Sequence, residues 1–209
     1  MLGKRSVAER LITEATGLTL VVLDTWKEAA VSVEPFPDQL PTEPPPVGAH
    51  VEVRVPRLTA LLSPERVLTW DQPMDRDSVL RQLVEKAVKG TDGLRADDVA
   101  NAVLKRENEG STFLTEGIAL PHARIEGLPG PLLALGRARQ GVTGVPVSQP
   151  GQLVWLILSP VRDPEIQIRL LAAASQMATN QPLLRDMMSA ATPEEVIAAL
   201  GVWEAGRCR

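Results

Sequence analysis

Apolar residues recur every three or four positions in several stretches of the chain after residue 57, and this spacing predicts amphipathic helices. One helix is predicted within residues 79–88 and ends before Gly90, a residue typical of helix C-termini. A second is predicted within residues 99–106, with Arg106 near its C-terminal end. Each stretch has one apolar stripe, so each helix is expected to cover one face of a core.

Capping signals predict where two later helices begin. Asp163 followed by Pro164 combines a side-chain N-cap with a proline in the first turn. Thr192 and Glu195 have the spacing of a capping box. Gly201 is predicted to end the helix that starts there.

Continuous apolar runs of strand length predict buried strands at residues 132–135 and 153–158, with Trp155 in the core. Residues 118–120 are too few for a helix and are interpreted as the end of another strand. A loop rich in glycine, proline and glutamine is expected at residues 140–152. Alternating short strands and helices are typical of an α/β sandwich, so we predict a mixed central sheet flanked by helices.

Proline content divides the chain. Seven prolines between residues 33 and 57 predict an extended linker, assigned to residues 27–56, and His50 within it is interpreted as a solvated residue. The main domain is assigned to residues 57–203 and a short tail to residues 204–209. Residues 1–26 predict one helix and one strand, which cannot enclose a core alone. We therefore expect them to pack on the main domain or on a second copy in a homodimer.

Ser6-Val-Ala-Glu-Arg-Leu11 and Leu20-Val-Val22 look like the last helix and strand of a universal stress protein domain. This resemblance implies that the chain is the C-terminal part of a longer protein. The nucleotide-binding glycine pattern of that family is missing, so the resemblance implies no ATP site.

Composition excludes several functional classes. The 209 residues are 44% hydrophobic, enough for a sizeable core, and a net charge of −4 without a basic run argues against nucleic-acid partners. The one cysteine, Cys208, excludes an internal disulfide and a cysteine–histidine metal cluster and suits a reducing compartment. The sequence shows neither a run of about twenty apolar residues nor a signal peptide, so we expect a cytoplasmic location.

One histidine follows a short apolar run within residues 110–124. Gly117 allows a backbone conformation that other residues resist, and Pro121 stiffens the chain before His122, which is expected at the mouth of a strand. A histidine there can act as an acid, base, metal ligand or nucleophile, because its unperturbed pKa lies near neutrality. The alternative is a histidine that is hydrogen-bonded for structure alone.

The residues around this histidine form a longer pattern: Arg106-Glu107, Gly110-Ser111-Thr112 and Gly117-Ile-Ala-Leu-Pro-His-Ala-Arg124. The pattern resembles the IIA domain (EIIA) of the bacterial sugar phosphotransferase system, in its fructose/mannitol and nitrogen-regulatory branch, and the resemblance covers most of residues 57–202. In that family the histidine accepts a phosphoryl group from the histidine phosphocarrier protein, and the arginine helps to hold the phosphate. The resemblance assigns these roles to His122 and Arg106.

Phosphoryl transfer to a histidine needs an unprotonated nitrogen and donors that hold the phosphate oxygens. Arg106 supplies a planar, charged fork. The hydroxyls of Ser111 and Thr112, with N–H groups of the turn at residues 117–122, are expected to complete an anion site. This chemistry requires no metal and no other cofactor.

The sequence departs from the family pattern at two positions. A second histidine in many relatives corresponds to Gln167, whose amide donates hydrogen bonds but carries no charge. Glu116 stands near the phosphate position and would repel a phosphoryl group if it faced the pocket.

Two functions therefore remain open. The first is a phosphoryl carrier for sugar uptake or for nitrogen and metabolic regulation, with the phosphocarrier protein and an EIIB domain or membrane transporter as partners. The second is a regulatory module derived from EIIA that is not phosphorylated and that is attached to or controls a membrane transporter.

Overall fold

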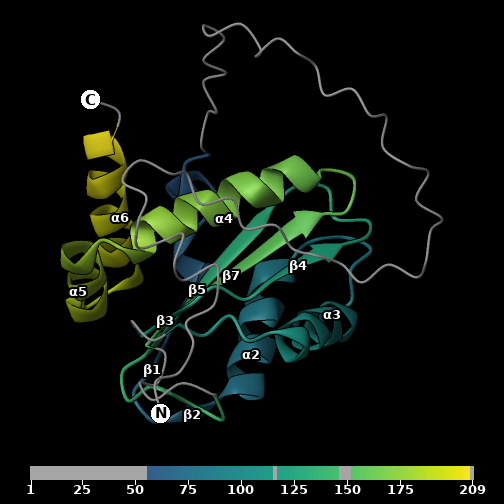
Figure 1. Ribbon diagram of the computed structural model, residues 1–209, viewed down its shortest axis with the longest axis horizontal. Coiled ribbons are helices and arrows are strands. Elements are labelled where there is room, and N and C mark those ends of the chain that lie inside the picture. The colour runs from purple at the N-terminus through teal and green to yellow at the C-terminus, as the bar shows by residue number, and fades with distance from the viewer. Residues whose placement is uncertain (1–55, 115–116, 146–151, 208–209) are drawn as a thin grey trace, which may run out of the picture. The chain divides into compact units, whose positions relative to one another are not determined.

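The computed structural model describes residues 56–114, 117–145 and 152–207 (Figure 1). They lie in the second of the two units into which the chain divides, residues 51–209. The helix and strand expected in residues 1–26, the linker with His50, and both Glu116 and Cys208 fall outside the described residues.

A mixed five-stranded sheet forms the centre of the described unit, as the sequence predicted. Its strands are β1 (Val67–Trp70), β5 (Leu132–Ala138), β7 (Leu153–Pro160), β3 (Ile118–Ala119) and β4 (His122–Ile125). Strand β7 runs antiparallel to β5 and pairs on its other side with both β3 and β4, which are parallel to it. Strands β2 (Met74–Asp75) and β6 (Val142–Thr143) form a separate parallel pair.

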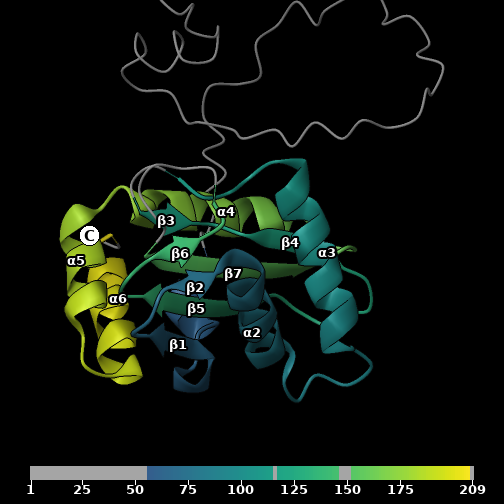
Figure 2. The same ribbon diagram turned by 90° about the horizontal axis from the view of Figure 1, so that it is seen from below.

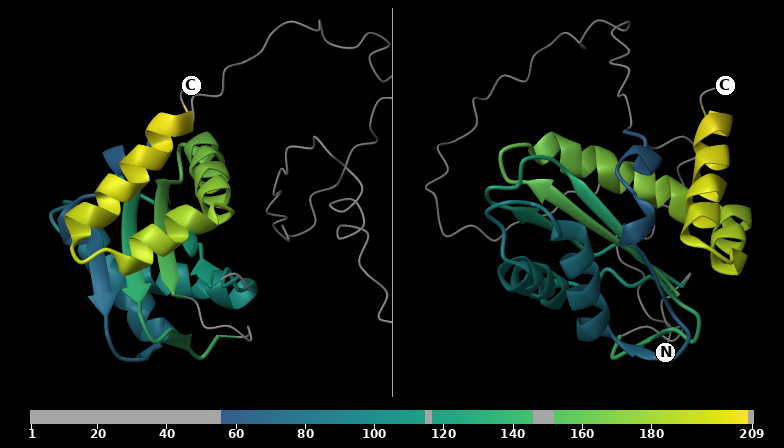
Figure 3. Two further views of the ribbon diagram at one scale, coloured as in Figure 1. Left: turned by 90° about the vertical axis from the view of Figure 1, so that its left-hand side faces the viewer. Right: turned by 180° about the vertical axis from the view of Figure 1, so that it is seen from behind.

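Helices cover both faces of this sheet (Figures 2 and 3). One face carries α2 (Arg76–Val88) and α3 (Ala96–Glu109), which pack on Ala134, Val154 and Leu156. The other carries α4 (Pro164–Ala178), α5 (Gln181–Ser189) and α6 (Pro193–Arg207), which pack on Leu133, Trp155 and Ile157. Both apolar runs predicted as strands are therefore buried on two sides, which explains why they show no alternation.

The local capping signals operate as predicted. The side chain of Asp163 accepts a hydrogen bond from the Ile166 N–H at the start of α4, and Thr192 Oγ1 accepts one from the Glu195 N–H at the start of α6. Gly90 follows α2 with a φ of +78°, a conformation that favours glycine.

Four features differ from the sequence predictions. Helix α6 does not end at Gly201 but continues to Arg207, so residues 204–207 are helical and not a tail. The segment expected to be a loop contains β6, and helix α5 was not predicted. Two short 3-10 helices, η1 (Leu58–Ala60) and η2 (Pro64–Arg66), precede the first strand.

Candidate functional site

His122 is the first residue of β4, on the outer edge of the sheet. Strand β3 ends at Ala119, and β4 then resumes pairing with the same neighbour, β7. The break falls at Pro121, which has no N–H to donate, while its carbonyl oxygen still accepts a hydrogen bond from the Ile157 N–H at 2.9 Å. The predicted strand end before His122 is confirmed, and a second strand starts at the histidine itself.

The imidazole of His122 is held in one tautomer. Its Nδ1 lies 2.9 Å from the carbonyl oxygen of Leu120, and the residue is 8% exposed. Because a carbonyl oxygen can only accept, Nδ1 must carry the hydrogen. In the neutral ring Nε2 is then the unprotonated nitrogen.

The face on which His122 lies follows from the strand register. His122 pairs with Ile157, and Arg124 pairs with Ser159. Paired positions direct their side chains to the same face of a sheet, and Ile157 belongs to the core beneath α4. His122 and Arg124 therefore share the α4 face. Arg124 was not predicted to be a site residue, although a spacing of two along a strand is the signal for a shared face.

Gln167 lies on this same face, in the first turn of α4. The residue is 9% exposed, and its Oε1 accepts a hydrogen bond of 3.0 Å from the hydroxyl of Ser159, which is fully buried. The bond orients the amide, so its Nε2 hydrogens point away from Ser159. Gln167 is therefore not a solvated helix residue. It forms a buried polar pair with Ser159, and this pair holds its side chain in one orientation.

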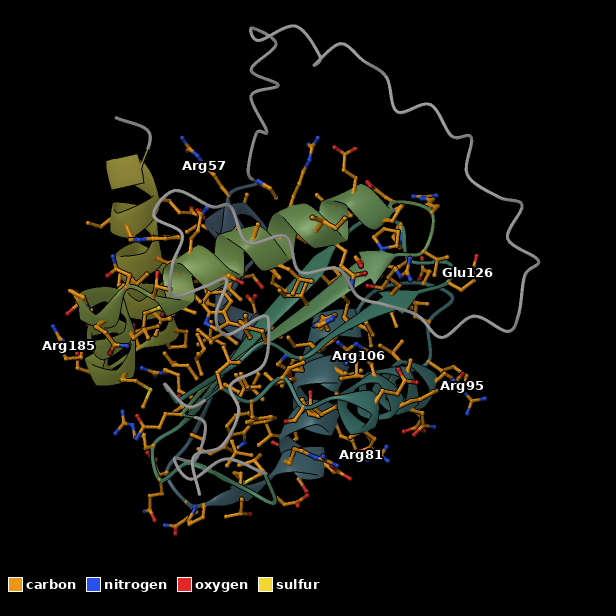
Figure 4. The ribbon with its side chains drawn as sticks, viewed as in Figure 1. Arg57, Arg81, Arg95, Arg106, Glu126 and Arg185 are labelled. Carbon is orange, nitrogen blue, oxygen red and sulfur yellow. The ribbon has the colours of Figure 1, made fainter. Side chains whose placement is uncertain are left out.

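Arg106 belongs to α3, which covers the face of the sheet opposite to α4. It lies in the last turn of α3, the helix that packs beside β4 (Figure 4). Its Nη1 donates a hydrogen bond of 3.1 Å to the carbonyl oxygen of Gly110. The guanidinium thus lies at the segment that leads from α3 to the histidine, as the sequence predicted for the end of this helix.

The hydroxyls of Ser111 and Thr112 are engaged within the protein. Both donate to the carboxylate of Glu107, at 2.7 and 2.6 Å, and the Thr112 N–H donates to the same carboxylate at 2.9 Å. A hydroxyl has a single hydrogen, so neither group can also donate to a phosphate oxygen in this arrangement. Glu107 was predicted only as part of a motif, because a buried carboxylate has no distinguishing local pattern in the sequence.

Backbone hydrogen bonds pair residues 112–114 with residues 118–120. The Leu114 N–H donates to the Ile118 carbonyl at 2.8 Å, and the Leu120 N–H donates to the Thr112 carbonyl at 3.2 Å. Gly117, with a φ of +79°, adopts the conformation expected of it, and its carbonyl accepts from the N–H groups of Gln152 and Leu153. The backbone immediately before His122 is thus fixed from both sides.

Comparison with known proteins identifies similar sequences. Residues 60–201 match the family model described as "Phosphoenolpyruvate-dependent sugar phosphotransferase system, EIIA 2". The chain is 26% identical over 136 residues to the fructose-specific EIIA component of Haloferax volcanii, covering 63% of this chain and 86% of that protein. It is 26% identical over 145 residues to the fructose-specific EIIABC component of Bacillus subtilis, covering 68% of this chain but only 22% of that protein.

Solved protein structures with a similar fold are known. The nitrogen regulatory protein IIA-Ntr from Neisseria meningitidis superposes with a TM-score of 0.58 and 23% identity, covering 68% of this chain and 97% of that chain. Among the described residues, no helix combines the length and the apolar character needed to cross a membrane.

Proposed function

We propose a phosphoryl-transfer mechanism for this chain, which belongs to the EIIA 2 family of the phosphoenolpyruvate-dependent sugar phosphotransferase system. In this mechanism Nε2 of His122 receives the phosphoryl group. The observation that supports this atom is the hydrogen bond from Nδ1 to the Leu120 carbonyl, because in the neutral ring it makes Nε2 the unprotonated nitrogen.

The proposed step is an in-line displacement at phosphorus. The electron pair of His122 Nε2 forms a new N–P bond, while the N–P bond to the donor histidine breaks and its electron pair returns to the donor imidazole. The hydrogen stays on Nδ1 throughout and remains hydrogen-bonded to the Leu120 carbonyl oxygen. This hydrogen bond stabilises positive charge on the phosphorylated ring, so the protein supplies positioning and electrostatics and no cofactor takes part.

Arg106 is proposed to hold the transferred phosphoryl group. Its guanidinium provides paired donors that match phosphate oxygens, and its place at the end of α3 brings it to the edge of β4. Gln167 is proposed to donate from Nε2 on the α4 face, with Ser159 keeping the amide in that orientation. Ser111 and Thr112 are proposed to contribute only if their hydroxyls leave Glu107 when phosphate arrives.

The uncharged amide of Gln167 has a predicted consequence for the product. A histidine at this position could become cationic and stabilise a phosphate dianion by its charge, whereas an amide donates a hydrogen bond but brings no positive charge. We therefore propose that phosphohistidine forms at His122 but is less stable than in a relative with two histidines. Glu116 is predicted to act in the same direction through like-charge repulsion.

The partners follow from the chemistry of the relatives. We propose the histidine phosphocarrier protein as the phosphoryl donor. The name of the Bacillus subtilis relative joins EIIA with B and C components in one chain, which supports an EIIB domain or a membrane transporter as the proposed acceptor. A regulatory role is supported by the likeness to a nitrogen regulatory protein. We propose that the chain works in the cytoplasm, where such donors occur.

Incubation with phosphorylated phosphocarrier protein, followed by intact-mass measurement, tests this function. Wild-type protein should take up one acid-labile phosphoryl group, and His122→Ala should take up none. His50→Ala provides the matched control, since it removes the other of the two histidines and should leave uptake unchanged. Arg106→Lys keeps the charge but loses the paired donors, so uptake should be slower by roughly tenfold.

Absence of acid-labile phosphate on the wild-type protein would contradict the proposal. If Gln167→His combined with Glu116→Asn then restored uptake, the natural chain would be the regulatory derivative, with a pocket adapted to binding.

A further inference from the structure

We propose that Glu107 is a positioning residue for His122, acting through Thr112 and Leu120. The inference rests on the proposed function, because it concerns the tautomer and orientation of the imidazole that receives the phosphoryl group. Three hydrogen-bonded steps connect the two side chains.

Burying the carboxylate of Glu107 is energetically unfavourable, and a role in positioning His122 explains why a carboxylate occupies this site. The residue is 2% exposed, and removing a carboxylate from water is unfavourable unless hydrogen bonds compensate. It also lies in the last turn of α3, where the helix dipole disfavours negative charge. An apolar side chain would fill this buried position without either cost. The carboxylate is compensated instead by three short hydrogen bonds, all from Ser111 and Thr112.

The first step of the connection fixes Thr112. The carboxylate of Glu107 accepts from both the N–H and the hydroxyl of this residue, with one oxygen for each. Because both the N–H and the hydroxyl of Thr112 are bonded, its backbone can neither shift nor rotate freely. Thr112 is thereby attached to the end of α3.

The second and third steps lead to the imidazole. The carbonyl oxygen of Thr112 accepts from the Leu120 N–H at 3.2 Å, which places the Leu120 peptide. The carbonyl oxygen of Leu120 then accepts from His122 Nδ1 at 2.9 Å. Because Pro121 restricts the chain between them, the orientation of the Leu120 carbonyl decides which nitrogen of His122 carries the hydrogen.

Loss of the carboxylate should therefore affect the imidazole before it affects the fold. Without Glu107, Thr112 loses two of its bonds, the Leu120 carbonyl becomes free to rotate, and the Nδ1–H tautomer is no longer selected. A displacement of about 1 Å at a reacting atom can reduce a rate roughly a hundredfold, so the effect on phosphoryl transfer should be large.

The tautomer is measured directly by nitrogen-15 NMR of the histidines in the full, unphosphorylated chain. The sequence holds only two histidines, and the His50→Asn variant assigns their signals. Wild-type His122 should be predominantly in the Nδ1–H form when its ring is neutral. Glu107→Ala should shift the signal toward the mixture of Nδ1–H and Nε2–H tautomers that a free imidazole shows. Glu107→Gln keeps an acceptor oxygen at the same distance from the backbone and should restore much of the wild-type signal.

Single-turnover transfer from phosphorylated phosphocarrier protein provides the second readout. Glu107→Ala should lower the rate constant at saturating donor by roughly tenfold to a hundredfold, with the half-saturating donor concentration changed less than about twofold. Glu109→Ala is the matched control, because it removes an exposed carboxylate two positions later on the same helix end. It should leave both quantities at their wild-type values.

A wild-type tautomer and a wild-type rate in Glu107→Ala would overturn the inference. If that variant does not fold, Thr112→Val and Thr112→Ser decide instead: the valine variant loses one bond to Glu107 and should show a lower rate constant, and the serine variant should recover it. Equal behaviour of these two variants would also overturn the inference. If the wild-type chain takes up no phosphate, the proposed function fails, and the NMR measurement still tests the role of Glu107.

Discussion

Gly136 on β5 shows how closely single residues are packed against the sheet. A Cβ atom added there would lie 2.5 Å from Cζ3 and 2.9 Å from Cη2 of Trp70. The indole cannot move away freely, because its Nε1 donates to Gln82 Oε1 at 3.0 Å. The absence of a side chain at this position is therefore a packing requirement of strand β1 against β5.

Gly136→Ala should destabilise the domain by about 1–3 kcal/mol, the usual cost of overpacking a buried site. Urea denaturation followed by tryptophan fluorescence measures this change. Gly130→Ala is the control, since a Cβ there meets nothing within 4 Å, and it should change the free energy of unfolding by less than about 0.5 kcal/mol. Equal stability of the two variants would show that Trp70 repacks without cost.

Helix α5 depends on a buried cation from a distant strand. Arg137 on β5 is 2% exposed, and its Nη1 donates to the carbonyl oxygens of Met187 and Ala190, at the C-terminal end of α5. Its Nε and Nη2 both donate to Thr69 Oγ1 on β1. The negative end of the helix dipole attracts this charge, while desolvation by burial lowers the pKa of the Arg137 guanidinium. One arginine thus connects two strands with the end of a helix.

Arg137→Met should cost about 2–4 kcal/mol of stability, because it leaves two helix-terminal carbonyls and the Thr69 hydroxyl without their donor. Thermal denaturation of the purified domain measures the loss. Arg139→Met serves for comparison: Arg139 makes an exposed ion pair with Asp71 at 3.4 Å, and surface pairs contribute at most about 1 kcal/mol. A smaller effect at Arg137 than at Arg139 would refute its capping role.

The two ends of the described domain are joined by Glu204 of α6. Its Oε1 accepts from the Leu58 N–H at 2.5 Å, and its Oε2 accepts from the Thr59 hydroxyl at 2.5 Å. Leu58 itself is 1% exposed and belongs to the core beneath α4 and α6. The folded unit therefore begins before residue 58 and includes the helix beyond Gly201.

A fragment of residues 56–209 should fold cooperatively, whereas a fragment of residues 61–209 should be less stable by about 3 kcal/mol or more. The shorter fragment loses a buried leucine and leaves the Glu204 carboxylate without its donors. Melting curves of the two fragments compare them directly. Equal melting temperatures would mean that η1 contributes nothing to the fold. Failure of the longer fragment to fold would contradict the predicted domain start near residue 57.

The sequence alone determined the features that depend on neighbours along the chain. The helix starts at Asp163 and Thr192 and the turn at Gly90 were predictable, because a cap or a left-handed residue acts within a few positions of itself. The mixed sheet between helices followed from two long apolar runs among amphipathic stretches. The motif around His122 was also evident in the sequence, as was the place of Arg106 at the end of its helix.

The tertiary structure decided what depends on distant partners. Strands β2 and β6, of two residues each, have too little pattern of their own and exist because they pair with each other. Helix α6 passes through Gly201, at an intrinsic cost of about 1 kcal/mol, since Glu204 binds Leu58, 146 positions away. The burial of Glu107 and the shared face of His122 and Gln167 have the same origin, because burial and register arise only when segments far apart in sequence meet.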